Sequence, residues 1–377
     1  MNLVQLINNQ IIMKMKKLIL ISFSLFMIGF LSCNDDSEII QNPDVLTEGC
    51  YIINFGNYGS GGASISKYDY VNDVMTNFYY QQQNDSKELL SNLQYASSFG
   101  DSVYLIGNAP DQLITLNKKL KQTRNSVTDQ LFNPRFCVGN GDYLYISCLG
   151  ENPDWSTMPD SYIAVYNLKT NAVEKKINLA GGPEGMAIAK GKLFAALNYK
   201  DSIAVINMTN DKVSYIKTPA VTTYFVKDDK ENLYVTLVST FNNFSTETGI
   251  GYINTGSERL SETFLIDNVS SGYGSIMVPN KDLSKIYIVT SSYDAEWNLT
   301  GAVSVFNVNS GVFDAEPIIG NISGINGIVS NNKYDLLYVL SAPSATGAGS
   351  LKIYSEEGNF LKEYAIGAFP TGAFFLD

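Results

Sequence analysis

The sequence predicts an all-β protein, a seven-bladed β-propeller whose C-terminal strand closes the first blade. Three observations predict this fold. The 377 residues include 24 tyrosines and 19 phenylalanines, residue types that strands favour. Two kinds of apolar segment alternate along the chain in seven copies each, and a third kind is missing at the start of the chain but present at its end. Internal repetition of this kind is typical of propellers and solenoids.

Two segment types form the core of the repeat. The first alternates aromatic and aliphatic residues, and its copies lie at 50–56, 103–108, 144–149, 193–198, 233–238, 286–291 and 337–342. A partner segment follows each copy, and the partners lie at 63–69, 112–118, 162–168, 202–208, 249–255, 302–308 and 350–356. Alternation with a period of two between polar turns predicts strands rather than helices.

A third segment type precedes the first in six of the units. Its copies lie at 93–100, 133–141, 182–191, 222–229, 272–280 and 324–332. The copy that is missing before residue 50 is found at the other end of the chain, as FPTGAFFLD at 369–377. We therefore expect the C-terminus to supply the innermost strand of the blade that the N-terminus begins, which closes the ring without a free edge. A β-sandwich or a solenoid, the alternative folds, would not need this permutation.

The amino-acid sequences of the repeats resemble those of a known propeller family. The strands LYVT (233–236), IYIVT (286–290) and LYVL (337–340), with partners ending in asparagine and a GGPEG turn (181–185), are similar to the YVTN/YncE-like seven-bladed β-propellers. The resemblance covers nearly all of residues 48–377. It implies the fold, whereas the function has to be argued from the site because this scaffold carries many functions.

The N-terminus has the order of a secretory signal peptide. Lys14, Lys16 and Lys17 precede an apolar run at 18–31, which is short for a membrane span. The run leads into Cys33, and the sequence FLSC resembles the cleavage box of bacterial lipoproteins, in which the cysteine is acylated and becomes the mature N-terminus. The resemblance implies lipidation at Cys33. An uncleaved anchor with an incidental cysteine is the alternative.

These features divide the chain into a signal peptide at 1–32, a lipidated flexible tether at 33–47 and the propeller at 48–377. Residues 1–12 would lie upstream of the true start if translation begins at Met13 or Met15. The acidic run NDDSE (34–38) resembles the tether of lipoproteins that are displayed on the outer face of the outer membrane, although ordinary linkers are acidic too. We expect an outer-membrane lipoprotein exposed at the cell surface, with the lipid as its contact with the membrane.

The charge of the chain excludes several classes of partner. The net charge is −11 and the isoelectric point is near 4.6. The arginines are only Arg124, Arg135 and Arg259, and the body of the chain has no basic block. Nucleic acid is therefore not expected as a partner, because binding it requires cations against the phosphates.

The remaining cysteines are Cys50, Cys137 and Cys148, an odd number that cannot pair fully within one chain. Each lies in an apolar, strand-like run, which favours a role as a small buried hydrophobic residue. The sequence leaves open whether Cys137 and Cys148 form a disulfide. The chain has no histidine and no CxxC motif, so we expect no metal site and no cofactor.

Function is expected on the face made by the loops between the second and third strands and by the turns into the innermost strands. Both tryptophans lie on such loops, Trp155 in GENPDWSTMPDS and Trp297 with Tyr293 in SSYDAEWNLT, and the loop STFNNFSTET carries Phe241 and Phe244. Rigid aromatics among Asn, Ser and Thr make a ligand platform that loses little rotamer entropy on binding. The alternative is that the long loops bury their own aromatics as local clamps.

The turns that lead into the innermost strands are expected to line the mouth of the central channel. Their candidate ligand-binding residues are Tyr95, Arg135, Glu184, Tyr224, Tyr273 and Asn326. Arg135 is suited to a ligand carboxylate or phosphate, and an ion pair with a neighbouring acid is an equal alternative.

The residue types do not favour catalysis. Without histidine the chain lacks the usual general base at neutral pH, and it cannot form a Ser-His-Asp triad. A carboxylate pair across the channel is the remaining route, with Glu184, Asp154, Asp294 and Glu296 as candidates. Repeats of the sialidase type are absent, and the propeller lyases that act on cyclic peptides use a histidine. We therefore expect no catalytic residue and no enzymatic activity.

These observations together favour a non-enzymatic protein that captures a scarce nutrient at the cell surface. The chain is similar to surface lipoproteins that bind cobamides (vitamin B12), and this resemblance implies a cobamide ligand and delivery to an outer-membrane TonB-dependent transporter. A surface protein-interaction scaffold and a glycan-binding propeller are the alternatives. A closed ring has no open sheet edges for pairing, which favours a monomer.

Overall fold

The computed structural model describes residues 48–57, 61–90, 92–239, 248–266, 276–293, 296, 298–344 and 346–376, without the side chains of 292 and 293. The predicted signal peptide, the tether and Cys33 lie outside these residues. Within the described ranges, no helix is long and apolar enough to cross a membrane.

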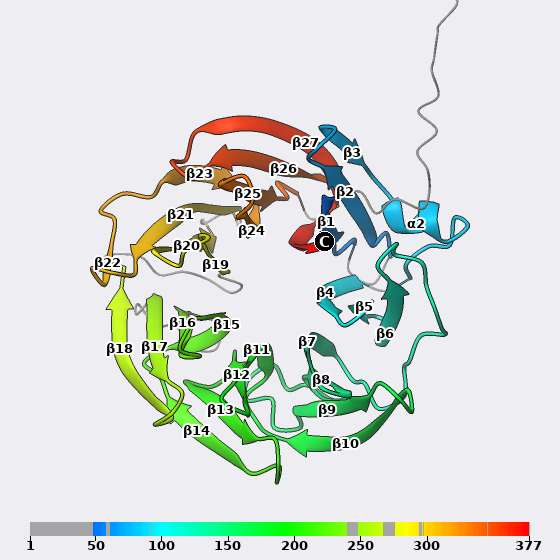
Figure 1. Ribbon diagram of the computed structural model, residues 1–377, viewed down its shortest axis with the longest axis vertical. Helices are drawn as coiled ribbons and strands as arrows, with labels where there is room; N and C mark the ends of the chain where they lie inside the picture. The colour runs from blue at the N-terminus through cyan, green and yellow to red at the C-terminus, as the bar shows by residue number, and fades with distance from the viewer. Residues whose placement is uncertain are drawn as a thin grey trace, which may run out of the picture. The chain divides into compact units, whose positions relative to one another are not determined.

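The described residues form seven antiparallel sheets arranged as blades in a ring (Figure 1), which confirms the predicted propeller. One strand of each blade faces the centre of the ring. These inner strands are β28 (Pro370–Leu376), β4 (Asn92–Phe99), β7 (Pro134–Asn140), β11 (Pro183–Ala189), β15 (Val221–Lys227), β19 (Met277–Pro279) and β24 (Ile325–Asn331).

The two predicted strand types are the second and third strands of the blades. The second strands are β1 (Gly49–Asn54), β5 (Ser102–Asn108), β8 (Tyr143–Cys148), β12 (Lys192–Leu197), β16 (Leu233–Val238), β20 (Lys285–Tyr293) and β25 (Leu336–Ser341). The third strands are β2 (Ser64–Asp69), β6 (Gln112–Asn117), β9 (Tyr162–Asn167), β13 (Ser202–Asn207), β17 (Gly249–Asn254), β21 (Leu299–Asn307) and β26 (Ala348–Ser355).

The outer strands are less regular. They are β3 (Val74–Thr76), β10 (Ala172–Asn178), β14 (Val213–Lys217), β18 (Arg259–Leu265), β22 (Val312–Phe313) with β23 (Ile319–Ser323), and β27 (Phe360–Ala368). The blade of β4 to β6 has three strands among the described residues. In place of a fourth strand, β6 forms two isolated bridges, Leu113 with Val127 and Leu116 with Gln122. The helix α2 (Tyr79–Gln83) lies between β3 and β4 and buries Tyr80.

Burial explains why the second strands are almost wholly apolar. Every residue of β16, LYVTLV, is buried because neighbouring blades cover both faces of its sheet. The outer strand β18 of the same blade has only exposed and half-buried residues. The hydrophobic core accordingly lies between blades, as where Ile106 of β5 packs in one cluster with Ile146 of β8.

The ring closes as predicted, through the C-terminal strand. β28 pairs antiparallel with β1, with Phe375 opposite Cys50, so the two ends of the chain share one blade. The amide of Phe55 also donates a hydrogen bond to the carbonyl of Phe369. This pairing gives the first blade its inner strand and removes the edge that β1 would otherwise present.

The cysteines have the predicted buried positions. Cys50, Cys137 and Cys148 are all free thiols in the interior. Burial raises the pKa of the Cys148 thiol to about 12. Such a thiol is not reactive at neutral pH, because the thiolate is the nucleophile.

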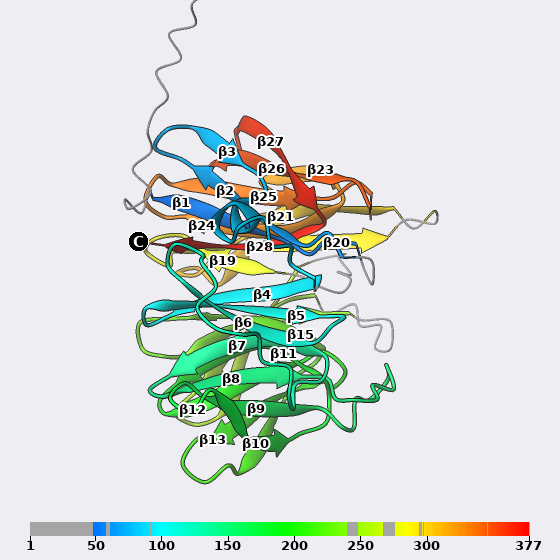
Figure 2. The same cartoon turned by 90° about the vertical axis from the view of Figure 1, so that its right-hand side faces the viewer.

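The prediction of a loop at 291–300 was wrong at both of its ends. β20 continues to Tyr293 and β21 starts at Leu299, with these two residues opposite each other in the ladder. The extension is possible because β23 pairs with the same part of β21, for example Ser323 with Thr300. Figure 2 shows this hairpin and the loop after β8 on the same side of the ring.

A side-chain bridge joins the first and last blades near their outer edge. The carboxylate of Asp73, at the turn between β2 and β3, accepts hydrogen bonds from Lys362, Tyr364 and Tyr68. These bonds lower the pKa of Asp73 to about 2 from an ordinary 3.8, even though its side chain is 48% exposed.

The carboxylate of Asp73 is expected to make the stability of the wild-type protein depend on pH, and its replacement should remove this dependence. The pKa is lower in the folded state, so the stabilisation is present above pH 3.8 and is lost as the pH falls towards 2. Asp73→Asn should lower the free energy of unfolding by about 1 kcal/mol at pH 7, because the pair is partly solvated. The difference from wild type should shrink as the pH falls from 3.8 and vanish below pH 2. Urea unfolding at several pH values measures this, with the exposed Asp101→Asn as control; a constant difference would contradict it.

Candidate functional site: a central pocket built from strand bulges

The inner strands share an irregularity at the point where they begin. In six of them one extra residue or two interrupt the pairing with the second strand of the blade. A bulge of this kind re-aims a side chain out of the regular alternation. The residues at these bulges are Thr371, Gln94, Arg135, Glu184 with Gly185, Thr223 with Tyr224, and Asn326.

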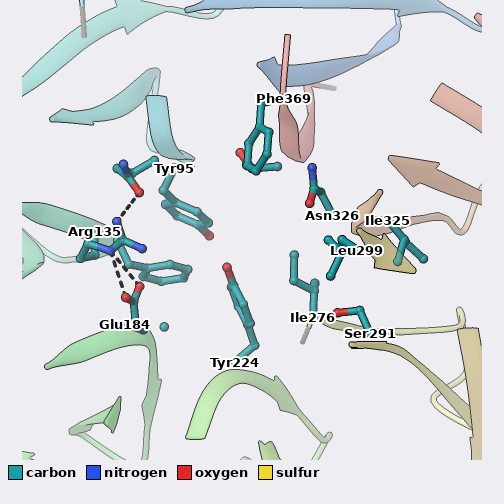
Figure 3. Close-up of a pocket in the computed structure, with 14 residues that line it drawn as sticks. Tyr95, Arg135, Glu184, Tyr224, Ile276, Ser291, Leu299, Ile325, Asn326 and Phe369 are labelled. Carbon is teal, nitrogen blue, oxygen red and sulfur yellow. Dashed lines mark hydrogen bonds and ion pairs between the residues drawn. The ribbon is translucent and has the colours of Figure 1, made fainter. Parts of the chain in front are cut away.

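The bulges meet at one pocket of about 200 Å³, which we call the central pocket (Figure 3). Strands from all seven blades, or residues next to them, contribute to its wall. The lining residues are Gln94, Tyr95, Arg135, Phe136, Glu184, Gly185, Tyr224, Ile276, Ser291, Leu299, Ile325, Asn326, Phe369 and Thr371.

The charged part of the central pocket is an ion pair between neighbouring blades. Nε of Arg135 lies 3.0 Å and 3.1 Å from the two carboxylate oxygens of Glu184. Nη1 of the same guanidinium donates to Oε1 of Gln94 at 2.5 Å. The side chains of the pair are only 18% and 10% exposed. The side-chain bonds between Gln94, Arg135 and Glu184 thus link three consecutive inner strands, β4, β7 and β11, near the point where each begins.

Two tyrosines stand beside this pair with their hydroxyls towards the middle of the central pocket (Figure 3). Tyr95 stacks on Phe136, with ring centroids 3.8 Å apart. Burial raises the pKa of Tyr95, and burial together with the charge of Glu184 raises the pKa of Tyr224 to about 12. Both hydroxyls are therefore protonated at neutral pH and can donate hydrogen bonds.

The opposite wall is mainly apolar. Ile276, Leu299 and Ile325 come from the blades of β19 to β21 and β24, across from the ion pair (Figure 3). Phe369 adds an aromatic ring from the residue before β28, and its backbone φ is 51°. A bulky residue in the left-handed region is strained, and such strain tends to occur at functional positions.

Two polar atoms of the central pocket are buried without a hydrogen-bond partner among the described residues. They are Nδ2 of Asn326 and Oγ1 of Thr371. Their strands β24 and β28 are neighbours in the ring, and the two residues occupy equivalent bulges. A buried polar group without a partner costs free energy that a ligand can recover.

The loop that carries Trp155 is held by internal hydrogen bonds. The carboxylate of Asp154 accepts bonds from the amides of Ser156, Thr157 and Met158 and from the hydroxyls of the first two, which lower its pKa. Met158 is buried at the foot of the loop. Trp155 itself is 54% exposed, with a backbone φ of 54°.

The base of this loop packs on the turn that leads into β11. The hydroxyl of Ser161 donates to the carbonyl of Leu179 and accepts from the amide of Gly182. The ring of Tyr199 is also close to Gly182, and its raised pKa reflects burial and the nearby charge of Glu184. The loop is thus braced against the strand that supplies Glu184, although Trp155 does not line the central pocket.

The structure brings together five of the six residues predicted at the channel mouth: Tyr95, Arg135, Glu184, Tyr224 and Asn326. Of the two alternatives for Arg135, the ion pair is observed. Tyr273, Phe241, Phe244, Trp297 and Asp294 lie outside the described residues, as does the side chain of Tyr293. Of the carboxylates considered for catalysis, Asp154 is engaged within its loop and Glu296 is exposed.

Sequence reasoning missed several lining residues, chiefly Gln94, Thr371 and Phe369. Alignment of the repeats would have found Gln94 and Thr371. The motifs LQY, PRF, PEG, ING and PTG are equivalent, and their middle residues are Gln94, Arg135, Glu184, Asn326 and Thr371. Phe369 carries no such signal, because its position depends on the closing pairing of β28. Among the described residues, no cluster of three or more Cys, Asp or Glu side chains could hold a metal ion.

Solved propeller structures resemble the chain over most of its length. A Quinonprotein alcohol dehydrogenase-like protein from Bacteroides thetaiotaomicron is 16% identical with a TM-score of 0.64, over 87% of this chain and 78% of its own. The periplasmic gluconolactonase of Pseudomonas aeruginosa is 12% identical with a TM-score of 0.63, over 88% and 99%. A putative 6-phosphogluconolactonase from Bacteroides uniformis is 14% identical with a TM-score of 0.62, over 88% and 100%. At these identities the likeness shows the fold alone.

A family model gives the more direct assignment. No curated protein matches the chain. The model described as "Domain of unknown function (DUF5074)" matches residues 48–254, which is more than half of the chain. This span runs from β1 to the end of β17 and includes the bulges at Gln94, Arg135, Glu184 and Tyr224. The chain therefore belongs to the DUF5074 family.

Proposed function

We propose that this protein captures a small-molecule ligand at the central pocket and releases it chemically unchanged. One observation carries the proposal: six inner strands each use a bulge to turn side chains into the same pocket. Side chains on strands of a closed ring are held precisely in place, so a ligand need not order them on binding. The pocket combines an apolar wall with a few polar groups, as ligand sites commonly do.

The chemistry of the central pocket supports binding rather than catalysis. Among its described lining residues Glu184 is the single carboxylate, and both of its oxygens face Arg135. The carboxylate of Glu184 is thus engaged by the guanidinium of Arg135. The hydroxyls of Tyr95 and Tyr224 are protonated at neutral pH, so neither acts as a base there.

The N-terminal sequence supports a location for this activity. Lys14 to Lys17, the apolar run at 18–31 and Cys33 have the order of a lipoprotein signal, and an acidic tether follows. We propose that a lipid on Cys33 holds the propeller at the surface of the outer membrane. A protein at that site would pass its ligand to a TonB-dependent transporter.

A cobamide is the ligand that the resemblance to surface capture lipoproteins suggests. The central pocket holds about 200 Å³, which is smaller than the 300 Å³ or more of sites that enclose a drug-sized ligand. A corrinoid ring would therefore lie across the face of the propeller, with one peripheral arm inside the pocket. Trp155, on its braced loop on that face, is a candidate contact for the exposed part of such a ligand.

Titration of the full chain, expressed with its own N-terminus and purified in mild detergent, with cyanocobalamin tests both levels of the proposal. We expect saturable binding by calorimetry and quenching of tryptophan fluorescence. Tyr224→Phe should weaken binding roughly 3- to 10-fold, the loss of one hydrogen bond. Tyr215→Phe is the matched control, because Tyr215 is an exposed tyrosine on the outer strand β14.

Two results would contradict the proposal at different levels. Absence of binding at micromolar concentrations would remove the cobamide as ligand. Small molecules that co-purify with the wild-type protein would then be identified by mass spectrometry, with the Tyr224→Phe protein for comparison. If neither cyanocobalamin nor any co-purifying molecule depends on Tyr224, capture at the central pocket is wrong.

A further inference from the structure

Among the described residues that line it, the central pocket is electrically balanced, which bears on the charge of its ligand. Among its described lining residues only Arg135 and Glu184 are charged, and they neutralise each other. An anionic group would meet the carboxylate of Glu184, and a cationic group would meet the guanidinium of Arg135. Moving either charge out of water into this site would be costly without a partner of opposite sign. The pocket therefore favours an uncharged group.

The unpaired polar atoms define which uncharged group fits. Nδ2 of Asn326 can only donate hydrogen bonds, whereas Oγ1 of Thr371 can both donate and accept. The two atoms come from equivalent bulges on neighbouring strands, next to each other in the ring. A primary carboxamide offers the complementary pair, a carbonyl oxygen for Asn326 and an N–H for Thr371.

The rest of the central pocket suits the atoms around such a group. The hydroxyls of Tyr95 and Tyr224 point inwards from the opposite side and are protonated, so they can donate to a second lone pair of the carbonyl or to a neighbouring oxygen (Figure 3). Ile276, Leu299 and Ile325 provide an apolar wall for the aliphatic chain that carries the amide. The volume of about 200 Å³ admits one short arm rather than a large ring system.

We propose that the central pocket is a subsite for a neutral carboxamide on a short aliphatic arm, and that it discriminates against the corresponding carboxylate. Asn326 and Thr371 bind the two ends of the amide group. The balanced pair of Arg135 and Glu184 supplies the discrimination. This inference rests on the proposed capture function and names the chemical group that the pocket takes, whether that group belongs to a small amide or to an arm of a larger ligand.

Four fragments of nearly equal shape test this assignment on the full chain in mild detergent. Ligand-observed nuclear magnetic resonance would compare isobutyramide, isobutyrate, isobutylamine and 2-methylpropan-1-ol. We expect isobutyramide to saturate, and the acid and the amine to bind at least roughly tenfold more weakly, because each leaves a charge without a free partner. The alcohol should be intermediate, since it offers one polar atom instead of two.

Variants then assign the signal to the two bulges. Asn326→Leu and Thr371→Val keep the side-chain shapes but remove the donor and the hydroxyl. Each should weaken isobutyramide roughly tenfold and leave the weak binding of the alcohol less affected. The exposed Asn125→Leu is the matched control and should bind like wild type. Unchanged thermal unfolding of each variant shows that the fold is retained.

A second set of ligands distinguishes the two possible sources of the amide, an arm of a corrinoid and a small free amide. Cyanocobalamin would be compared with its derivative in which one peripheral amide is hydrolysed to the acid, for each available position. Selective loss of affinity for one derivative, reduced by Asn326→Leu, identifies a corrinoid arm as the occupant. Equal affinities for all derivatives, with fragments behaving as expected, identify a small free amide instead.

Several outcomes would overturn the assignment while leaving capture in place. Binding of isobutyrate as tight as isobutyramide would refute the discrimination. Isobutyramide binding that is unchanged in Asn326→Leu, or no saturation by isobutyramide up to its solubility limit, would refute the carboxamide subsite. If the wild-type protein nevertheless binds cyanocobalamin or a co-purified molecule through Tyr224, only the present inference fails. Loss of all binding in the wild-type protein would instead refute the proposed function.

Discussion

Arg135→Ala is expected to lower the free energy of unfolding by about 3 kcal/mol, one of the largest effects of any single change at the central pocket. The carboxylate of Glu184 would remain in a site where the residue is only 7% exposed, without the guanidinium that it faces. Gln94 would lose its donor as well. Removing one member of a buried ion pair costs more than the pair contributes, because the other charge is left without compensation.

Urea unfolding followed by circular dichroism measures this effect. The control for the loss of an ion pair is Lys169→Ala, whose partner Asp142 is exposed, and this change should lower the free energy of unfolding far less than Arg135→Ala does. The double variant Arg135→Leu with Glu184→Leu should be closer to wild type than Arg135→Ala alone, since no buried charge remains. Equal effects of Arg135→Ala and Lys169→Ala would show that the central pair is not buried in solution.

Gly185→Ala should be the second severe change, with a loss of roughly 2–3 kcal/mol, the range for a forced contact in a packed interior. A Cβ at this position would lie 2.4 Å from the carbonyl oxygen of Thr223 on the neighbouring inner strand. The contact is with backbone, so no side chain can rotate away. β11 and β15 would have to move apart, which would displace Glu184 and Tyr224 at the central pocket.

The ring offers a matched control for this substitution. Gly372 follows Thr371 in β28 as Gly185 follows Glu184 in β11, but a Cβ at Gly372 would meet only the end of the Ile53 side chain at an ordinary 3.7 Å. Gly372→Ala is therefore expected to change the free energy of unfolding by less than about 1 kcal/mol. Thermal unfolding of both variants is the measurement. Similar midpoints for the two would contradict the close approach of β11 and β15.

The fold could be predicted from the sequence because its information is local and repeated. Segments such as LYVTLV at 233–238 are apolar throughout, as a strand covered on both faces must be, and the turns between them are polar. The displaced copy at 369–377 predicts the closing strand. The loop at 291–300 was mispredicted because its pairing depends on β23, which arrives from later in the chain.

The candidate site could be predicted only in part. Arg135, Glu184, Tyr224 and Asn326 were identifiable as residues that lead into the inner strands, and they do share one pocket. That Arg135 faces Glu184, 49 residues along the chain, was only one of two alternatives at the sequence level. Gln94 and Thr371 were missed because a bulge, which is a matter of pairing register, decides which residue of each turn points inwards.

The sequence by itself determined the number of blades, the order of their strands and the closure of the ring, since each follows from alternation and repetition along the chain. Only the tertiary structure decided which side chains meet at the centre and in what state. The neutralised pair of Arg135 and Glu184, the protonated tyrosines and the unpaired atoms of Asn326 and Thr371 depend on distances between blades. Charge, desolvation and hydrogen bonding act through space, and the chain brings these residues together from positions more than 200 residues apart only when the ring is closed.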